Sequence, residues 1–349
     1  MRQRLSLWRR NLKDTVRAVA KTLPARSSAD GVENVARLAE GLTQIDRDEL
    51  LVSDVVLQKN LNSIVRRFDI RSASAPGRDP VLQLVEKRSR NLKEYRLYRH
   101  FASSRNGLGR RIAPRVHLAK RYWLTNPDDY RSLILIDHLA GCGLPDYSEA
   151  AAHRLADKMS LISSLPAEEM PWVPKAENRL TPELLNDFVE AATAKGHVES
   201  PEAKSLIEAM RRDWHRISAL PLDRLPAVPC HNDLHVKNLG VQRIEGRNEY
   251  LFFDWEKFGL NYLGSDLHHF LCKSISEPEF KPFFDTLNAR YKEIVCKKHR
   301  VDERYVDLAA LSYGLFRCMT RSVMHKDNKR RRSQMNQVAT IFGRMKELL

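Results

Sequence analysis

The residues best suited to chemistry lie between positions 231 and 254. Asp233 and Asn238 stand five residues apart, and Asp254 follows a short apolar segment at residues 251–253. A carboxylate such as Asp233 can orient or deprotonate a hydroxyl that attacks a phosphoryl group. The oxygens of Asn238 and Asp254 are hard ligands of the kind that Mg²⁺ prefers. Together, these side chains have the types that phosphoryl transfer from ATP requires.

Each of these side chains also has a purely structural alternative. Asp233 and Asn238 are common in turns, and Asp254 could cap a helix. Their order and spacing nevertheless match the catalytic loop H-x-D-x-x-x-x-N of kinases and the metal-binding Asp that follows it. We therefore expect a kinase site, in which His231 braces the loop. A zinc pair of His231 and His235 is a weaker alternative, because the sequence offers no evident third ligand.

A cation for the nucleotide phosphates is expected on the third strand of a small β-rich lobe. Lys87 ends the strand predicted at residues 81–87, and Glu94 on the following helix is its expected ion-pair partner. Gln83 has the same strand parity as Lys87, so it remains an alternative for that position. The sequence alone does not decide between them.

The segment 59–63, between the first two predicted strands, is expected to cover the phosphates. It contains no glycine and is therefore a poor match to a glycine-rich loop. Backbone amides, or the side chains of Asn62 and Ser63, would contact the phosphates instead.

These residues are carried by a small β-rich lobe followed by a large helical one. Apolar alternation and turn signals predict the first lobe, and apolar periodicity after Gly143 predicts the second. We expect an α+β chain with a basic helical extension at residues 1–50, a first lobe at 51–138 and a second at 139–349. The individual elements expected are strands at residues 51–57, 64–70, 81–87 and 133–136, a helix at 90–102, and a hairpin formed by 238–244 and 250–254.

Bulk composition excludes several classes of protein. The chain has 349 residues, 42% of them hydrophobic, which is enough for a sizeable core. It has no stretch of about 18 apolar residues and no apolar secretory segment at its start, so we expect a cytoplasmic protein. Its five cysteines form no C-x-x-C pair, which favours reduced thiols over a disulfide framework or a zinc ribbon.

The strong positive charge suggests contact with something anionic. The formal net charge is +15, and the first 29 residues form a basic pattern with one apolar stripe. A helix of this kind either packs on the protein body or lies on an anionic membrane, which would place the chain at the inner face of that membrane. No nucleic-acid-binding motif accompanies the charge, so no specific nucleic-acid partner is expected.

From Cys230 to Leu267 the chain resembles the aminoglycoside phosphotransferase and choline/ethanolamine kinase superfamily. The segment 230–234 looks like the catalytic loop of choline kinases, and Asp254-Trp255-Glu256 is followed at the family's spacing by Asn261, Tyr262, Gly264 and Asp266. The resemblance implies a bilobal protein kinase-like fold that uses Mg²⁺ and ATP on a small-molecule hydroxyl. It is diffuse over the small lobe and does not cover the first fifty residues.

The resemblance also implies roles for individual residues. Asp233 would be the catalytic base, Asn238 and Asp254 would bind Mg²⁺, and Asp266 would support the catalytic loop. Residues 133–139 would form the hinge that binds adenine, with contacts at Ile136, Asp137 and Leu139.

The acceptor is only partly defined by the resemblance. Choline kinases enclose a quaternary ammonium in aromatic rings. Tyr313 and Phe316 stand where that family has two tryptophans, and Glu256 could pair with a cation. Lys257, however, replaces a family tyrosine and would repel an ammonium group. Packing in the helix core is an equal alternative for Tyr313 and Phe316.

Two alternatives to an active enzyme remain open at this stage. The glycine-free segment at 59–63 would also suit a catalytically weak nucleotide-binding scaffold. The basic segments at 1–29 and 329–332 would also suit a membrane-associated adaptor. A polycationic antibiotic is a poorer acceptor for so basic a chain than a sugar, an anionic compound or a lipid-linked compound.

Overall fold

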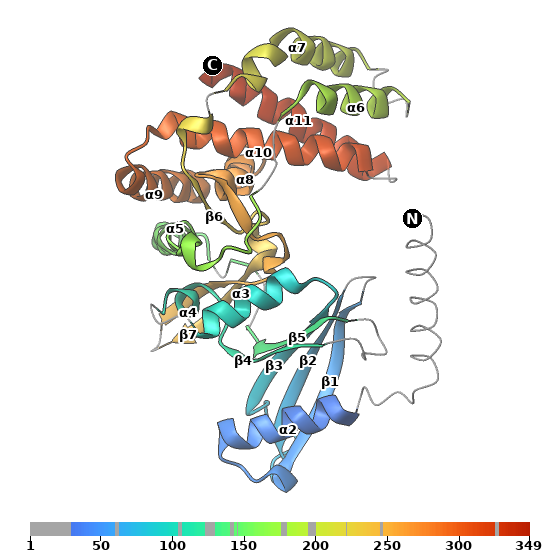
Figure 1. The fold of residues 1–349 in the computed structure, drawn as a ribbon, viewed down its shortest axis with the longest axis vertical. Coiled ribbons are helices and arrows are strands. Elements are labelled where there is room, and N and C mark those ends of the chain that lie inside the picture. Colours follow the sequence, from blue (N-terminus) through green and yellow to red (C-terminus); the bar gives the residue numbers. More distant parts are fainter. Residues whose placement is uncertain are drawn as a thin grey trace, which may run out of the picture. The chain divides into compact units, whose positions relative to one another are not determined.

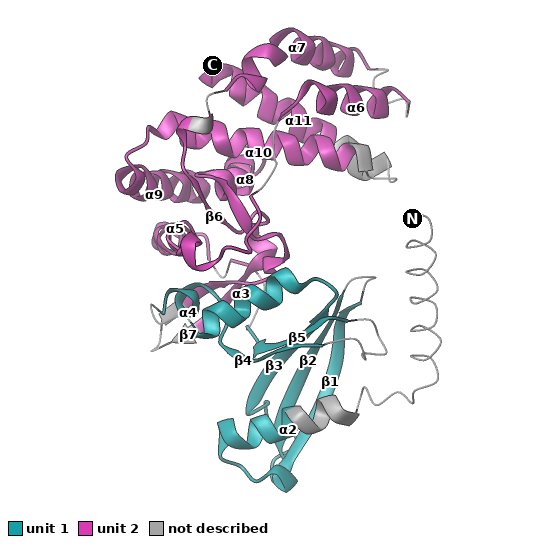
Figure 2. Ribbon diagram, in the orientation of Figure 1, with its two compact units in different colours: residues 1–139 teal, residues 140–349 magenta. Residues whose placement is uncertain are grey.

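A computed structural model describes residues 29–59, 63–103, 107–122, 130–139, 143–144, 146–175, 180–194, 200–220, 222–244, 247–324 and 328–349. The chain divides into two compact units, residues 1–139 and residues 140–349 (Figure 2). Each unit has its own core. Asn62 and the basic segment 1–28 lie outside the described residues.

Unit 1 is built on a five-stranded antiparallel sheet (Figure 1). Its spatial order is β1-β2-β3-β5-β4, so β5 lies between β3 and β4. The strands alternate inward and outward side chains, and each therefore presents two different faces. Their bounds are β1 Leu50–Lys59, β2 Ser63–Ser72, β3 Leu82–Ser89, β4 Val116–Arg121 and β5 Ser132–Asp137.

One face of this sheet is covered by helix α2, Ala29–Thr43. Val35 and Ala39 of this helix belong to an apolar cluster with Phe68, Leu84 and Leu135 of the sheet. Burial of such side chains removes apolar surface from water, which fixes the helix on the sheet. The described part of the expected N-terminal extension is therefore packed on unit 1.

Helix α3, Leu92–Ser103, contacts the other face of the sheet. On β3, Leu84 is in the apolar cluster beneath α2, whereas Lys87 forms an ion pair with Glu94 of α3. Strand alternation explains this division, because residues at odd and even positions point to opposite faces. The short helix α4, Leu108–Ile112, follows α3, and the 3₁₀ helix η1, Arg47–Glu49, precedes β1.

The strands predicted near residues 51–57, 64–70, 81–87 and 133–136 are confirmed as β1, β2, β3 and β5. Strand β4 was not predicted. Its sequence, VHLAKR, ends in two basic residues, and none of its six side chains is fully buried. It becomes a strand because it pairs with β5 at the edge of the sheet, and propensity alone does not register such a tertiary pairing.

Unit 2 is mainly helical. Helices α6, α7, α10 and α11 share one apolar cluster, in which Phe188, Trp214, Leu315 and Phe342 are buried. Figure 1 shows α10 running alongside α11. The helices are α5 Glu149–Ile162, α6 Pro182–Thr193, α7 Pro201–Ser218, α8 His268–Ser276, α9 Lys281–His299, α10 Glu303–Met324 and α11 Asn328–Leu348, with 3₁₀ turns η2 Ala167–Glu169, η3 Leu222–Arg224 and η7 Pro278–Phe280.

Two short strand pairs interrupt the helices of unit 2. Strand β6, Ala227–Cys230, pairs with β9, Gly259–Tyr262, and β7, Leu239–Ile244, pairs with β8, Arg247–Phe252. The second pair is the predicted hairpin. The turns η4 Val236–Asn238, η5 Trp255–Lys257 and η6 Ser265–Leu267 lie beside these strands in sequence. The loops that leave β6 and β8 carry the residues singled out in the sequence.

Substitution of Gly264 should destabilise unit 2. Gly264 has φ of 102°, and a Cβ there would lie 2.5 Å from the carbonyl oxygen of Val306 on α10. Gly264→Ala should therefore lower the free energy of unfolding by about 2 kcal/mol or more. Chemical denaturation followed by tryptophan fluorescence measures the change.

Gly343→Ala is the matched control for this prediction. Gly343 lies inside α11, and nothing stands within 4 Å of an added Cβ. Alanine there should leave stability unchanged or raise it by up to about 1 kcal/mol, because glycine is the weaker helix former. Equal stability of the two variants would contradict the proposed clash with Val306.

Candidate active site

The loop that follows β6 is held by a buried carboxylate. Asp266 in η6 accepts the backbone N–H groups of His231 and Asn232, each at 2.8 Å, one on each of its two oxygens. Asp266 is 4% exposed, so these bonds are made away from water. The strand pair β6–β9 brings the two segments together, since η6 follows β9 closely.

Asn232, directly before Asp233, has a left-handed backbone conformation with φ of 63°. Asparagine tolerates this region better than most residues. Its side-chain nitrogen donates to the carbonyl of Lys257 at 3.2 Å, and its side-chain oxygen accepts from Asn261 at 2.7 Å. These contacts fix the backbone of Asn232 and therefore the position of the next residue, Asp233.

The carboxylate of Asp233 lies among three cations. Oδ2 accepts from Lys257 Nζ at 2.8 Å, and Oδ1 accepts from Arg317 Nη2 at 2.5 Å. Arg321 Nη2 is 3.7 Å from Oδ1. Burial alone would raise the pKa of Asp233, but Arg317 and Lys257 outweigh it and hold that pKa well below its usual value. Asp233 is therefore ionised at neutral pH.

Helix α10 supports the same loop. The Tyr313 hydroxyl donates to the Asn232 carbonyl at 2.6 Å, and Arg317 Nη1 donates to that same carbonyl. The Arg317 guanidinium also lies over the Tyr313 ring, 5.6 Å from its centroid. Arg317 thus links the backbone of Asn232 to the side chain of Asp233.

Asn238 and Asp254 are brought to the same place by the start of the hairpin. Asn238 Nδ2 donates to the backbone carbonyl of Asp233 at 2.9 Å, and the Asn238 carbonyl accepts the N–H of Phe253 at 3.1 Å. Asp254 follows with φ of 62°. Leu239 pairs with Phe252 at the open end of the hairpin, so Asn238 and Asp254 lie next to the same end of this strand pair.

This donor set fits Mg²⁺. The amide nitrogen of Asn238 is bonded to Asp233, which directs the carboxamide oxygen elsewhere. One such oxygen and one carboxylate are typical of Mg²⁺, which takes its remaining ligands from phosphates and water. Among the described residues, no group of three or more His, Cys, Asp or Glu side chains could hold a metal, so the suggested zinc site is not found.

His231 lies where a brace is needed. It is fully buried, and its Nε2 donates to the Phe253 carbonyl at 3.0 Å. Its ring lies 4.5 Å from that of Trp255, measured between centroids. Burial lowers its pKa to about 4, so the ring is neutral at pH 7. His231 ties the catalytic loop to the segment that carries Asp254.

In unit 1, Lys87 Nζ lies 2.7 Å from Glu94 Oε2, as expected from the sequence. Gln83 instead donates to Asp69 at 2.6 Å. Glu94 is 1% exposed, so Lys87 neutralises a buried charge. The geometry favours Lys87 over Gln83 for the cation position.

The other expected nucleotide contacts lie at strand ends of unit 1. Ser63 begins β2, and Asp137 ends β5, where its carboxylate lies 2.5 Å from His117 Nε2. Ile136 and Leu139 are buried. Nucleotide contact at these four residues stays a prediction.

The aromatic enclosure expected for a quaternary ammonium stays a prediction, and Tyr313 has a second role in the structure. Tyr313 is buried, and its hydroxyl is bonded to the catalytic loop, so it braces that loop. Lys257 puts its ammonium group on Asp233, where a cationic acceptor would meet repulsion. Phe316 and Glu256 are partly exposed.

Arg317 and Arg321 were missed in the sequence. Together with Tyr313 they recur every four residues and therefore share one face of α10. That spacing was visible, but nothing in the sequence shows that this face meets Asp233, which lies more than 80 residues earlier.

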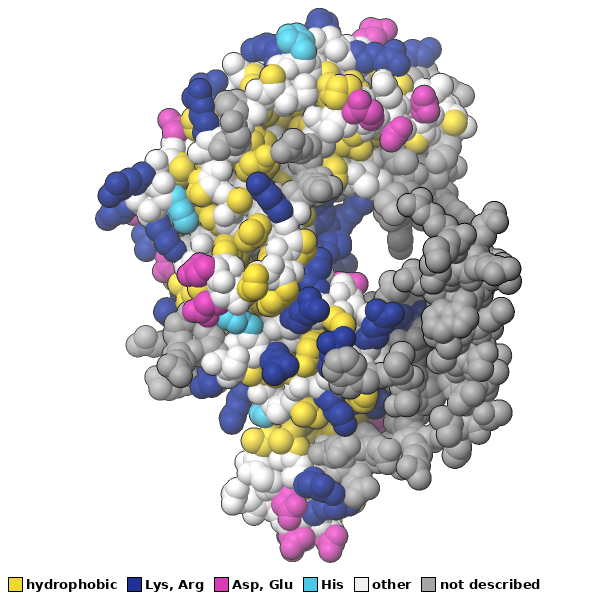
Figure 3. Space-filling model, in the orientation of Figure 1, with side chains coloured by type: hydrophobic (Ala, Val, Ile, Leu, Met, Phe, Trp, Pro, Cys, Tyr) yellow, Lys and Arg dark blue, Asp and Glu magenta, His cyan; other side chains and the backbone are white. Residues whose placement is uncertain are grey.

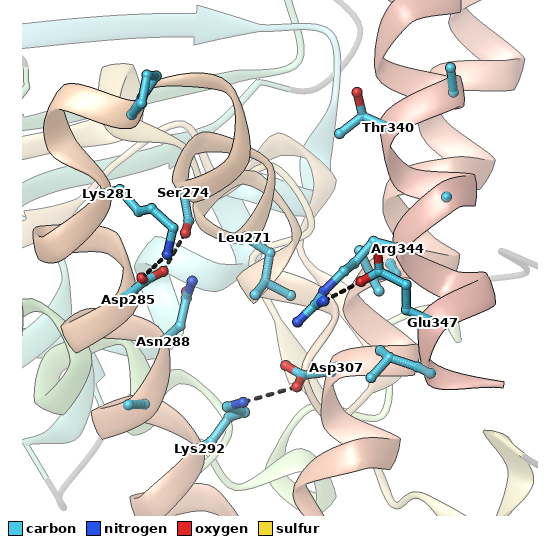
Figure 4. Close-up of a pocket in the computed structure, with 16 residues that line it drawn as sticks. Leu271, Ser274, Lys281, Asp285, Asn288, Lys292, Asp307, Thr340, Arg344 and Glu347 are labelled. Atoms are coloured by element: carbon cyan, nitrogen blue, oxygen red, sulfur yellow. Dashed lines mark hydrogen bonds and ion pairs between the residues drawn. The ribbon is translucent and has the colours of Figure 1, made fainter.

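A separate pocket of about 710 Å³ lies among α8, α9, α10 and α11 (Figure 4). Its charged groups pair within the pocket: Lys292 with Asp307 at 2.9 Å, and Arg344 with Glu347. None of the motif residues lines it. This pocket therefore carries no part of the proposed chemistry.

Lys and Arg side chains are spread over both units on the face drawn in Figure 3. In the described part of the chain, no helix combines the length and apolarity needed to cross a membrane. Cys230, Cys272, Cys296 and Cys318 are free thiols.

The family of the chain follows from comparison with known proteins. The loop, its carboxylates and its oxygen donors define a site of the type that transfers phosphoryl groups. The model of the phosphotransferase enzyme family matches residues 76–304, well over half of the chain. The chain belongs to this family and is therefore a phosphotransferase. No curated protein matches it in sequence.

Solved structures show the same fold at low identity. A spectinomycin phosphotransferase with ADP and spectinomycin is 15% identical, with a TM-score of 0.51 over 86% of this chain and 93% of that chain. A GDP complex of aminoglycoside 2′-phosphotransferase-IIIa is 14% identical, with a TM-score of 0.55 over 89% and 99%. Plasmodium vivax ethanolamine kinase is 12% identical, with a TM-score of 0.50 over 96% and 95%. These likenesses confirm the α+β, kinase-like fold.

Acidification should destabilise the folded chain. Burial lowers the pKa values of His231, His268 and His269, so all three are neutral when folded and take up protons on unfolding. The stability they contribute is present above about pH 6.5 and is lost as the pH falls. Asp266 opposes this, because burial raises its pKa to about 6, but it is one group against three.

The melting temperature should therefore fall by about 5 °C or more between about pH 7.5 and pH 5.5. His269→Gln, which removes one of the buried titrating rings, should reduce the difference between the two melting temperatures. Differential scanning calorimetry at both pH values measures it. A melting temperature that stays constant or rises on acidification would contradict the assignment of neutral histidines.

Proposed function

We propose that this chain transfers the γ-phosphoryl group of Mg²⁺-ATP to the hydroxyl of a small molecule. The observation that carries the proposal is the network that joins the three motif segments. Asn238 bonds to the backbone of Asp233 and to that of Phe253, and Asp254 comes next. Scattered turn residues would not be tied together in this way.

Asp233 would hold the acceptor hydroxyl. Its low pKa makes it a weak base, so its main task is to accept the hydrogen bond of that hydroxyl and aim the oxygen at the γ-phosphorus. The acceptor oxygen forms a bond to phosphorus while the bond to the β–γ bridging oxygen breaks. The nucleoside diphosphate leaves with that electron pair, and the hydroxyl proton passes through Asp233 to solvent.

The metal and the nucleotide would each be held by residues already placed. Asn238 and Asp254 would hold Mg²⁺, which when bound neutralises charge on the phosphates. Lys87, paired with Glu94, would contact the phosphates of the nucleotide. Ser63, Ile136, Asp137 and Leu139 are proposed to line the nucleotide site. The ADP and GDP complexes of the similar structures support nucleotide use.

The similar structures also support a small-molecule acceptor. Their names include spectinomycin phosphotransferase, aminoglycoside 2′-phosphotransferase and ethanolamine kinase. The acceptors of these proteins differ widely, so they define a class of reaction and not the compound used by this chain.

One observation favours a catalytically weak nucleotide-binding scaffold as a second candidate. Both oxygens of Asp233 already accept hydrogen bonds from cations, Lys257 on one and Arg317 on the other. A hydroxyl would have to share these oxygens. Arg317 is buried and stays on Oδ1, but Lys257 is half exposed and can move away from Oδ2. Because Oδ2 can then accept a hydroxyl, the active enzyme is the better candidate.

Replacing Asp233 with Asn should reduce Mg²⁺-dependent ATP turnover by about 10²- to 10⁴-fold, because the hydroxyl or water loses the group that orients it. Turnover is measured as release or transfer of labelled γ-phosphate, and circular dichroism reports whether the variant is folded. Asp254→Asn provides a second test through loss of a metal ligand.

The matched control for Asp233→Asn is Asp187→Asn, which changes an exposed carboxylate on α6. It should leave turnover unchanged. If Asp233→Asn and Asp187→Asn were equally active, the catalytic assignment would fail. Nucleotide binding without turnover by the unmodified protein would instead favour the scaffold.

Replacing Lys87 with Met should lower kcat/KM for ATP by about tenfold to a hundredfold, since a charge-assisted contact with phosphate is lost. Steady-state kinetics with varied ATP measures this effect. Arg96→Met removes an exposed cation from α3, the helix that also carries Glu94, and should have no effect. The Lys87 assignment would be wrong if both variants kept the original kcat/KM.

A further inference from the structure

The surroundings of Asp233 contain more positive charge than this carboxylate can balance. Lys257 comes from η5, and Arg317 and Arg321 come from successive turns of α10. All three approach the same carboxylate, at 2.8, 2.5 and 3.7 Å. The other nearby carboxylates have separate roles, because Asp266 holds the loop and Asp254 is proposed to bind Mg²⁺.

The three cations are not equivalent. Arg317 is buried and is bonded to Asn232, Tyr313 and Asp233, so it is a fixed part of the loop support. Arg321 approaches only to 3.7 Å of Asp233, and its side chain is 37% exposed. Lys257 is 50% exposed and lies on a long flexible stem. Arg321 and Lys257 can therefore turn toward a ligand without breaking the loop support.

The positive charge of Arg321 is disfavoured by its surroundings. Burial lowers its pKa, and the neighbouring positive charge of Arg317 lowers it further. A group that brings a negative charge beside Arg321 would relieve both effects. A positively charged group placed there would meet Lys257 and Arg321 at close range and would be repelled.

The arginines come from a part of the chain that the family match does not cover. That match ends at residue 304, whereas Arg317 and Arg321 lie on α10 beyond it. The loop that the family model matches thus meets a cationic helix face from outside the matched residues. Arg317 and Arg321 lie beside Asp233 and can therefore affect which acceptor binds there.

We infer that the acceptor carries an anionic group, a carboxylate or a phosphate, next to the hydroxyl that is phosphorylated. Arg321 and Lys257 bind this anionic group while Asp233 holds the hydroxyl. The inference rests on the proposed function, and it makes the acceptor opposite in charge to an aminoglycoside or to choline. The likeness to aminoglycoside and ethanolamine kinases therefore does not extend to the charge of the acceptor.

A different role for the same cations would be contact with the transferred phosphoryl group. The two roles differ in kinetics. Acceptor binding by Arg321 and Lys257 affects kcat/KM for the acceptor according to its charge, whereas contact with the phosphoryl group affects all acceptors equally, water included.

The test compares acceptors that share a hydroxyl and differ in charge. The compounds are glycerol, glycerate and glycerol phosphate, and then glucose, glucuronate and glucosamine. Transfer from labelled ATP is measured, and each compound is also tested as an inhibitor of ATP hydrolysis to water, which reports binding even without transfer. We expect the anionic compounds to exceed their neutral and cationic counterparts by about tenfold or more in kcat/KM or in inhibition. Comparing glycerate with glycerol phosphate separates carboxylate from phosphate recognition.

The substitutions Arg321→Gln and Lys257→Gln should remove most of this preference for anionic compounds. Arg290→Gln and Lys273→Gln are the matched controls, because Arg290 pairs with Asp157 and Lys273 with Glu277 rather than with Asp233, and they should retain it. Equal use of neutral and anionic compounds, or equal loss for all acceptors in Arg321→Gln, would overturn the inference and leave the proposed function standing. Absence of any Asp233-dependent hydrolysis or transfer would refute the proposed function, and the inference with it.

Discussion

The active-site loop depends on the buried carboxylate of Asp266, which accepts two successive backbone N–H groups. This pair of bonds holds Asn232 in a left-handed conformation that an unsupported chain would rarely adopt. The direction of Asp233 follows from that conformation. Its carbonyl in turn fixes the amide of Asn238, and the backbone of Asn238 fixes the chain just before Asp254. The position of Asp233, Asn238 and Asp254 therefore depends on the two hydrogen bonds of Asp266.

The second support of the loop comes from α10 and differs in kind. Tyr313 and Arg317 both donate to the Asn232 carbonyl, whereas Asp266 of η6 accepts from the backbone N–H groups of the loop. The same helix brings Arg317 and Arg321 to Asp233. A single helix face thus combines a structural task with an electrostatic one. This links the stability of the loop to the charge that the acceptor encounters, because Arg317 takes part in both.

Contacts within the family-matched segment and contacts from outside it meet at Asp233. The residues expected to react, Asp233, Asn238 and Asp254, are held by contacts within the segment that matches the family. The surrounding charge is supplied by Lys257, which lies within that segment, and by Arg317 and Arg321 of α10, which lie beyond it. Residues from inside and outside the matched segment therefore set the electrostatic environment of Asp233.

Local sequence determined much of this protein. Strands β1, β2, β3 and β5, the hairpin and the Asp233–Asn238–Asp254 spacing follow from short-range patterns, since strand alternation and turn chemistry act over a few residues. The Lys87–Glu94 ion pair could be expected for the same reason, because a strand and the next helix fix it. Only the tertiary structure decided that β4 is a strand, that Tyr313 braces the loop and that Arg317 and Arg321 meet Asp233. Most of those contacts join segments that lie far apart in the sequence. A local pattern shows which face of a helix or strand is apolar, but it does not show which other element packs on that face.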